Sequence, residues 1–183
     1  MQPPDYNPGW QAFQHLMTEI DVPAKTILLR EGEVSRQAYQ ILRGCIRLWF
    51  NDNGRDITFQ FFFEGQGVSS IESFRTGRPS LFYMETVEPC TLRVITKADF
   101  DKMLAEAPGF KELIEASIYQ RLEHYFALFL SRIRDTPHQR YLDLIKDHPE
   151  IIRRVPQHYI ASYLGITPVS LSRIRNKTDK TRR

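Results

Sequence analysis

The sequence has little of what marks several specialised classes of protein. It has only two cysteines, Cys45 and Cys90, which is too few for a disulfide framework or a four-cysteine metal site. Its longest apolar runs, at residues 61–63 and 127–130, are far shorter than a membrane span. The first ten residues lack the basic and apolar stretches of a secretory signal. We therefore expect a soluble, cytoplasmic protein.

The net charge is small but unevenly distributed. The 183 residues carry a formal net charge of +3. Residues 1–131 hold 13 basic and 17 acidic residues, a net charge of −4, whereas residues 132–183 hold 12 basic and 5 acidic residues, a net charge of +7. An acidic body followed by a basic segment favours a polyanionic partner for that segment. A solvated basic tail would give the same pattern.

The region 24–96 has the two-residue alternation that is typical of β-strands. Alternating apolar residues at 46–50 and 57–63 flank Asn51-Asp52-Asn53-Gly54, which is a strong hairpin signal. Further strand-like runs lie at 27–29, 39–42, 81–87 and 91–95. Seven or eight short strands with such turns predict a sandwich or barrel. We expect the aromatic residues of 57–63 to lie on one face, toward the core.

Helical spacing marks the segments on either side of this region. Residues 8–20 predict a short amphipathic helix that ends at Pro23. Thr96 is the expected N-cap of a helix that reaches Leu104. Pro108 begins a helical pattern of about 27 residues that runs through Arg134. Two shorter helices are expected at 137–147 and after Pro156.

The pattern at 108–134 is too long and too apolar to stand alone in water. Its apolar positions recur every three or four residues, and they are Phe110, Leu113, Ile114, Ile118, Leu122, Tyr125, Phe126, Phe129, Leu130 and Ile133. We expect this stripe to pack on its own β-domain and on the same helix of a second subunit, as a homodimer. The alternative is an ordinary core helix within one chain.

The most specific pattern is QHYIASYLGITPVSLSRIRN at 157–176, which predicts two helices joined by a tight turn. Gly165 lies where the chain reverses and a positive φ is favoured. Thr167 is the expected cap of the second helix, and Pro168 takes its first position, where a missing N–H costs nothing. Small and apolar residues at the inward positions complete a helix-turn-helix. They are Ile160, Ala161, Leu164, Leu171 and Ile174.

In a helix-turn-helix the second helix enters the major groove by its N-terminal end. Arg173 is the first candidate for base contact, because a guanidinium can bond guanine O6 and N7 together. Arg175 and Lys177 suit phosphate contacts, which add affinity without sequence information. A solvated surface side chain is the alternative at each position. The full set of candidate DNA-binding residues is Thr167, Val169, Ser170, Ser172, Arg173, Arg175, Asn176 and Lys177.

The order of these parts resembles the CRP/FNR family of bacterial transcription regulators. The segments that carry the resemblance are KTILLREGE, YQILRGCIRLWF, ITKADFDKML and YLGITPVSLSRIRNK, and the last is similar to short, wingless members common in Bacteroidetes. The resemblance implies an α+β fold in three parts. These are a cyclic-nucleotide-binding-like jelly roll at 1–107, a dimerisation helix at 108–134 and a helix-turn-helix DNA-binding domain at 135–183.

The same resemblance implies a function and partners. A homodimer would bind a palindromic operator in double-stranded DNA, with RNA polymerase as a further candidate partner. A small-molecule effector, whose identity the sequence does not give, would bind the jelly roll and shift the long helices. Residues 135–137 would act as the hinge. No cofactor can be named from the sequence.

Two departures from the family pattern concern specificity. Family members that bind cyclic nucleotides carry a Gly-Glu pair and an Arg-Ser pair, where Ser69-Ser70 and Ser80-Leu81 stand here. Because a buried phosphate would then lack its charge partner, we do not expect cyclic AMP as the ligand. Many relatives have Arg-Glu near the start of the recognition helix, where this sequence has Pro168-Val169. The DNA sequence that this protein binds should therefore differ from theirs. The candidate effector residues are Ser69, Ser70, Ile71, Glu72, Arg78, Ser80 and Phe82.

Other functions fit the sequence less well. Jelly rolls also host metal-dependent oxygenases, which need two or more histidines on the strands, but all five histidines lie outside 24–96. No nucleophile-elbow motif supports Ser-His-Asp chemistry. We therefore expect no enzyme, no catalytic residue and no metal site. The remaining alternative is a ligand-binding or protein-interaction module that has lost DNA binding.

Overall fold

The computed structural model describes residues 15–181. The strands are β1 (Thr18–Val22), β2 (Ile27–Leu29), β3 (Gln37–Arg43), β4 (Ile46–Asp52), β5 (Arg55–Phe62), β6 (Gly67–Val68), β7 (Tyr83–Thr86) and β8 (Cys90–Thr96). The helices are α1 (Ile71–Thr76), α2 (Lys97–Glu106), α3 (Pro108–Arg134), α4 (Pro137–Asp147), α5 (Pro149–Arg154), α6 (Gln157–Tyr163) and α7 (Pro168–Thr181).

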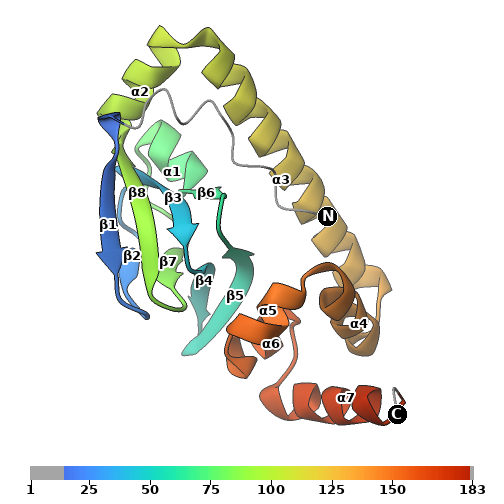
Figure 1. Ribbon diagram of the computed structural model, residues 1–183. Helices are drawn as coiled ribbons and strands as arrows, with labels where there is room; N and C mark the ends of the chain where they lie inside the picture. The colour runs from blue at the N-terminus through green and yellow to red at the C-terminus, as the bar shows by residue number, and fades with distance from the viewer. Residues whose placement is uncertain (1–14, 182–183) are drawn as a thin grey trace. The chain divides into compact units, whose positions relative to one another are not determined.

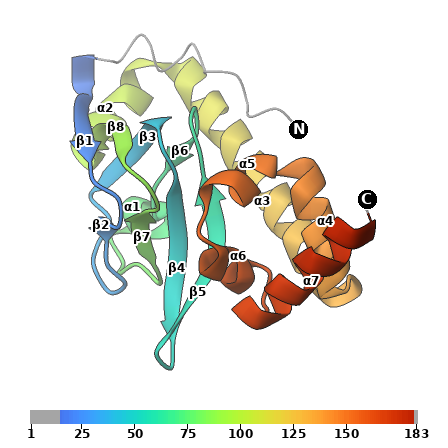
Figure 2. The same ribbon diagram turned by 60° about the horizontal axis from the view of Figure 1, so that its bottom comes forward.

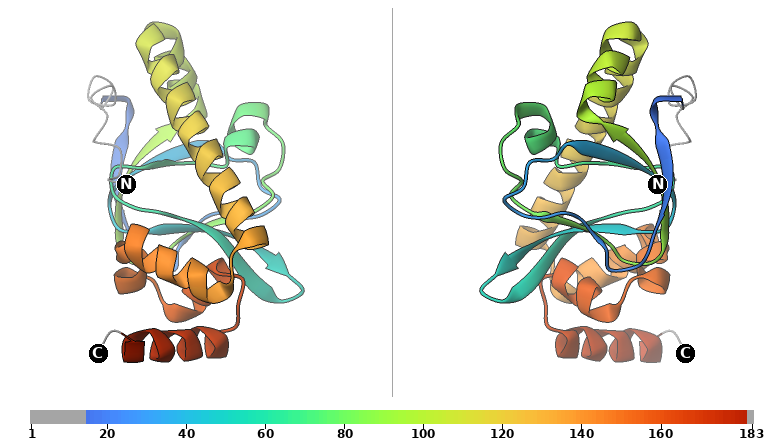
Figure 3. Two further views of the ribbon diagram at one scale, coloured as in Figure 1. Left: turned by 90° about the vertical axis from the view of Figure 1, so that its right-hand side faces the viewer. Right: turned by 90° about the vertical axis from the view of Figure 1, so that its left-hand side faces the viewer.

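The strands form two four-stranded sheets, in the orders β1-β8-β3-β6 and β2-β7-β4-β5 (Figure 1). These interleaved orders are those of a double-sheet jelly roll, which confirms the β architecture expected from the alternating pattern. Its hydrophobic core contains apolar side chains that are almost completely buried, such as Ile41, Ile46, Met84 and Leu92. The short helix α1, green in Figure 3, lies in the connection between β6 and β7.

The β4–β5 hairpin follows its sequence signal (Figure 2). Asn53 and Gly54 have φ of 51° and 85°, the left-handed values that such a tight turn requires. The expectation that one face of β5 would pack on the core was incomplete. Phe61 is buried, but Thr58 and Gln60 on the opposite face are also only 0% and 9% exposed. A strand that is covered on both faces does not show a simple polar face in its sequence.

A second apolar layer covers the outside of the sheet that contains β3 and β8. Ala38, Phe74, Ile95, Met103 and Phe110 form a buried cluster that joins this sheet to α1, α2 and the start of α3. Phe100 meets the rings of Phe74 and Phe110 edge to face. The beginning of α3 therefore packs on the β-domain, as the apolar stripe predicts.

Most of the helix boundaries agree with the sequence, and two do not. Asp99 donates its backbone N–H to Thr96 Oγ1 at 3.2 Å, which confirms the cap, and α3 has the expected bounds. The helix expected at 8–20 is wrong in its last four residues, because Met17 has no helical structure and Thr18–Val22 is a strand paired with β8. Residues 8–14 lie outside the described residues. Helix α5 has only six residues and was not expected.

The chain divides into two compact units. The first includes the residues up to Phe50 and Phe61–Gln120, and the second includes Asn51–Gln60 and the chain from Arg121 onward. The tip of the β4–β5 hairpin thus belongs with the C-terminal helices. The three sequence domains proposed above, 1–107, 108–134 and 135–183, stay a prediction.

Candidate nucleic-acid interface and effector site

Helices α6 and α7 are joined by a short turn at Leu164–Thr167 that follows the sequence signal closely. Gly165 has a φ of 68°, and Ile166 donates its N–H to the carbonyl of Ala161 at 2.9 Å. Thr167 Oγ1 accepts the N–H of Ser170 at 3.1 Å, which satisfies one free donor of the first turn of α7. The backbone of the turn is therefore fixed by its own hydrogen bonds.

The inner sides of the two helices are closely packed. Ile160 and Ala161 of α6 and Leu164 at the start of the turn are at most 3% exposed, and Leu171 of α7 is 1% exposed. The absence of a large side chain at Ala161 allows the helices to approach each other. Because this packing fixes the rotation of α7 about its axis, it also decides which side chains face outward.

Four exposed residues share the outer face of α7. They stand at positions i, i+3, i+4 and i+7, and they are Val169, Ser172, Arg173 and Asn176. Of the other predicted DNA-binding residues, Thr167 and Lys177 are exposed, while Ser170 and Arg175 are half-buried. The hydroxyl of Ser170 lies 3.0 Å from Thr167 Oγ1. The structure thus brings most of the predicted set to one face, with Ser170 occupied by the cap.

Two arginines that the sequence did not reveal hold the turn between α6 and α7. Arg132 donates from Nη2 to the carbonyl of Tyr163 at 2.5 Å, and Arg140 donates to the carbonyl of Leu164 at 3.0 Å. These carbonyls end α6, where the helix dipole is negative and favours cations. Burial, with the nearby charge of Arg140, lowers the pKa of Arg132. Burial also raises the pKa of Tyr163 to about 12, so its ring stays neutral.

The hairpin tip contacts α6 through one serine. Ser162 donates its hydroxyl to the carbonyl of Asp56 at 2.7 Å and accepts the N–H of Thr58 at 2.8 Å. It therefore occupies the free edge of β5 as a neighbouring strand would. Nothing in the sequence indicated this contact, because the partners are more than 100 residues apart.

The second half of α3 exposes apolar side chains, unlike its start. Tyr119, Leu122, Phe126, Phe129 and Ile133 are between 47% and 69% exposed. Their spacing of three, four, three and four residues is the heptad spacing of a coiled-coil seam. Phe110, in contrast, is 3% exposed.

The predicted effector residues surround α1, and their polar groups are largely bonded within the chain. Ser70 and Ser80 are 2% and 3% exposed, and their hydroxyls are 3.0 Å apart. Ser73 accepts the N–H of Ser35 at 2.9 Å and donates to the carbonyl of Arg78 at 2.5 Å. We call Ser35, Ser70, Ser73 and Ser80 the serine cluster.

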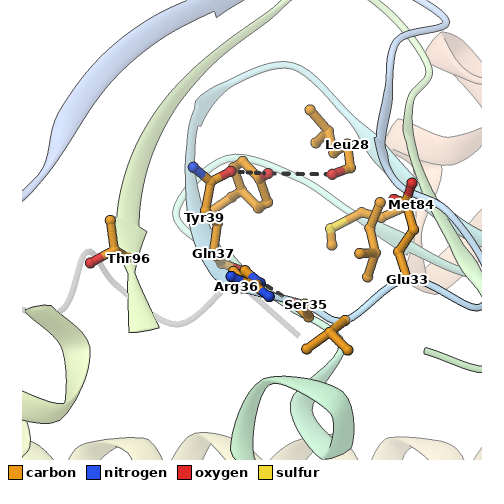
Figure 4. Close-up of a pocket in the computed structure, with 10 residues that line it drawn as sticks. Leu28, Glu33, Ser35, Arg36, Gln37, Tyr39, Met84 and Thr96 are labelled. Atoms are coloured by element: carbon orange, nitrogen blue, oxygen red, sulfur yellow. Dashed lines mark hydrogen bonds between the residues drawn. The ribbon is translucent and has the colours of Figure 1, made fainter. Parts of the chain in front are cut away.

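The other predicted effector residues are more open. Glu72 and Arg78 are exposed and face each other at 3.7 Å, while Ser69, Ile71 and Phe82 are half-buried. None of the seven lines the cavity of about 410 Å³ shown in Figure 4. That cavity lies instead beside Tyr39, whose hydroxyl bonds Gln37 Oε1 at 2.9 Å. Burial raises the pKa of Tyr39. The effector site therefore stays a prediction.

Residues 15–181 also lack two features that would bear on function. Within that part of the chain, no group of three or more His, Cys, Asp or Glu side chains is arranged to hold a metal ion. No helix in the same range combines the length and the apolar character that crossing a bilayer would require.

Comparison with known proteins finds a family model that matches the segment containing the strands after β1 and the helix α2. Residues 19–107 match the family model described as the cyclic nucleotide-binding domain. None of the curated protein sequences matches this chain closely enough to count as a relative.

Solved structures resemble nearly the whole chain. The c-di-GMP-responsive global regulator CLP of Xanthomonas campestris has a TM-score of 0.79 at 15% identity, over 95% of this chain and 92% of its own. FixK2 of Bradyrhizobium japonicum has a TM-score of 0.76 at 19% identity, over 90% and 85%. The catabolite activator protein of Thermus thermophilus has a TM-score of 0.59 at 16% identity, over 98% and 85%. At these identities the likeness establishes the fold.

Proposed function

We propose that this chain, whose residues 19–107 match the family model of the cyclic nucleotide-binding domain, is a non-enzymatic transcription regulator of the CRP/FNR type that binds DNA as a homodimer. The observation that carries the proposal is the outer face of α7. Its four side chains are exposed to solvent, and its backbone is fixed by packing on α6. Solved structures that share this fold include a global regulator and a catabolite activator protein, and this likeness supports the proposed role in regulation.

The chemistry of α7 suits the major groove. In a helix-turn-helix the second helix presents its N-terminal turns to the bases. Arg173 can donate two hydrogen bonds to guanine, and Asn176 can bond adenine at N6 and N7. Lys177 and Arg175 lie where phosphate contacts would add affinity. The one acidic residue in the sequence of α7 is Asp179, close to its end.

The exposed seam of α3 supports the homodimer. Covering apolar side chains at heptad spacing with another surface is favourable, and the same helix of a second copy has the matching spacing. A two-fold dimer would present two copies of α7, and a palindromic operator requires them about 34 Å apart.

The effector role is proposed for the region of α1. The region lacks an arginine in the Arg-Ser position, and the serine cluster offers no cation to a phosphate. A ligand other than cyclic AMP would then shift α3 and re-space the two recognition helices.

The proposal is tested by selection from a pool of random-sequence duplexes, with salt titration. We expect the wild-type protein to enrich a palindrome. Arg173→Ala should lose about 10- to 100-fold in affinity and relax one base preference, since a bidentate contact contributes about 1–3 kcal/mol. Arg43→Ala, which removes an exposed arginine from the β-domain, should bind as the wild type does.

Two results would count against it. If Arg173→Ala retains every base preference, Arg173 is not a base-reading residue. If no duplex is enriched, even after cell extract has been added to supply an effector, the chain is a ligand-binding or protein-interaction module that has lost DNA binding.

A further inference from the structure

We propose that Val169 determines sequence specificity by contacting the 5-methyl group of a thymine in each operator half-site. This inference rests on the proposed function and deepens it. It assigns an apolar contact with DNA to one residue on a face that is otherwise polar, and it predicts which base that residue contacts.

The exposure of Val169 is the first observation. Val169 is 61% exposed, whereas the other apolar residues of α7 turn inward: Leu171 is 1% exposed and Ile174 is half-buried. The side chain is therefore not needed to hold α7 on α6. It is the apolar member of the face formed with Ser172, Arg173 and Asn176.

The backbone at Val169 is held in place before any ligand binds. Pro168 occupies the first position of α7, and the Thr167 cap fixes the first turn through the N–H of Ser170. A β-branched side chain in a helix has one strongly preferred rotamer. Both methyl groups of Val169 are therefore presented at fixed positions, with little conformational entropy left to lose on binding.

The chemistry of the groove then selects the base. The isopropyl group of valine can neither donate nor accept a hydrogen bond. If it covered a polar group on a base edge, that group would lose its hydrogen bond to water and gain no other. The thymine 5-methyl is the apolar group that base edges present in the major groove, and apolar side chains contact it. Val169 therefore favours a T·A pair at the position it covers.

The position of Arg173 on α7 predicts how far this thymine lies from a second contacted base. It follows Val169 by four residues, one helical turn and about 6 Å along the axis. Base pairs are stacked about 3.4 Å apart, so the two side chains reach positions within about two base pairs of each other. The predicted half-site has a thymine read by Val169 close to a guanine read by Arg173.

The test uses full-length protein and the duplex enriched by selection. Each thymine of a half-site is replaced in turn by uracil, which keeps every hydrogen-bonding group and removes only the methyl. We expect one position at which uracil weakens wild-type binding about fourfold, the factor that corresponds to burying one methyl group. Val169→Ala, whose single methyl group lies closer to the backbone, should show a smaller difference between the thymine and uracil duplexes.

Three more variants make the test specific. Val169→Thr keeps one methyl group in the same place and should retain the uracil sensitivity. Val169→Glu should shift the preference at that position toward C·G, because a carboxylate accepts from cytosine N4. Ser172→Ala, on the same face, is the matched control and should keep the wild-type response. Since these side chains are exposed, the urea midpoint of each variant should equal that of the wild type.

The outcomes are separable. Uracil sensitivity that is absent in the wild type, or that is undiminished in Val169→Ala, overturns the role of Val169 and leaves the regulator intact. Failure to enrich any duplex overturns the proposed function itself, and the present inference with it.

Discussion

The serine cluster and the outer face of α7 are both rich in polar side chains, and the sequence predicts binding residues in both, namely Ser70 and Ser80 in the cluster and all four residues of the α7 face. In the serine cluster the side chains are buried and bond one another or nearby backbone groups. On α7 the corresponding groups are exposed at the surface. Polar residues that have found partners within the chain contribute to folding, whereas those still facing water are available for a partner outside it.

This difference separates two kinds of experiment. A substitution in the serine cluster should change the free energy of unfolding. A substitution on α7, or on the exposed seam of α3, should change binding while leaving the fold intact.

The largest effect is expected for Phe126→Glu on the exposed seam of α3. Phe126 is 59% exposed in the single chain, so the variant should fold. A carboxylate without a partner in a dimer interface costs about 3 kcal/mol or more, which corresponds to about 100-fold in DNA affinity. Sedimentation analysis should show monomers where the wild type shows dimers.

The matched control for this variant is Gln120→Glu, which introduces the same charge at an exposed position beside the seam. It should remain dimeric. A Phe126→Glu protein that still sediments as a dimer would show that this seam does not join two copies.

The fold could be predicted largely because its signals are local. The hairpin depends on Asn53-Gly54, the bounds of α3 depend on Pro108 and on the break at 135–137, and the turn before α7 depends on Gly165 and Thr167. Each of these signals acts within a few residues, so the sequence contains it in full.

What the sequence could not predict depends on contacts between distant residues. Ile20 fits helical spacing equally well, but its pairing with Leu92 places it in a strand. The hydrogen bond between the hydroxyls of Ser70 and Ser80, which are ten residues apart, is one such contact. The contacts of Arg132 with Tyr163, and of Ser162 with Thr58, likewise have no signature in the residues beside them.

The second largest effect is expected for Ser73→Ala in the serine cluster. Ser73 is 1% exposed, and its loss leaves the buried N–H of Ser35 and the carbonyl of Arg78 without this hydroxyl. Leaving buried polar groups unsatisfied costs about 1–3 kcal/mol, which urea unfolding would measure. Ser172→Ala on α7 should change stability by less than about 0.5 kcal/mol. Equal losses in the two variants would erase the distinction between the two sites.

A smaller effect is expected for alanine at two glycines with similar backbone. Gly77 and Gly165 have φ of 73° and 68°, so alanine at either should cost about 1 kcal/mol in strain. A Cβ at Gly77 meets nothing, whereas one at Gly165 would lie 2.8 Å from Arg132 Nη1. Thermal unfolding should therefore show a greater loss for Gly165→Ala.

The same pair of variants should differ in DNA binding. Gly165→Ala displaces Arg132 from the carbonyl of Tyr163 and should weaken binding, while Gly77→Ala should not. In an Arg132→Ala background the two glycine substitutions should become equal in their effect on stability. If the difference persists there, Arg132 is not its cause.

The smallest effect is a pH dependence within the C-terminal unit, where His124 of α3 packs edge to face on His148 with ring centroids 5.9 Å apart. Burial, and then the charges of His148 and Arg121, lower the pKa of His124. His148 Nδ1 also lies 3.3 Å from Glu150. Because His124 takes up a proton more readily in the unfolded chain, stability should fall as the pH drops through about 6.5. His124→Gln should flatten this slope in urea titrations from pH 7.5 to 5, and an unchanged slope would place its origin elsewhere.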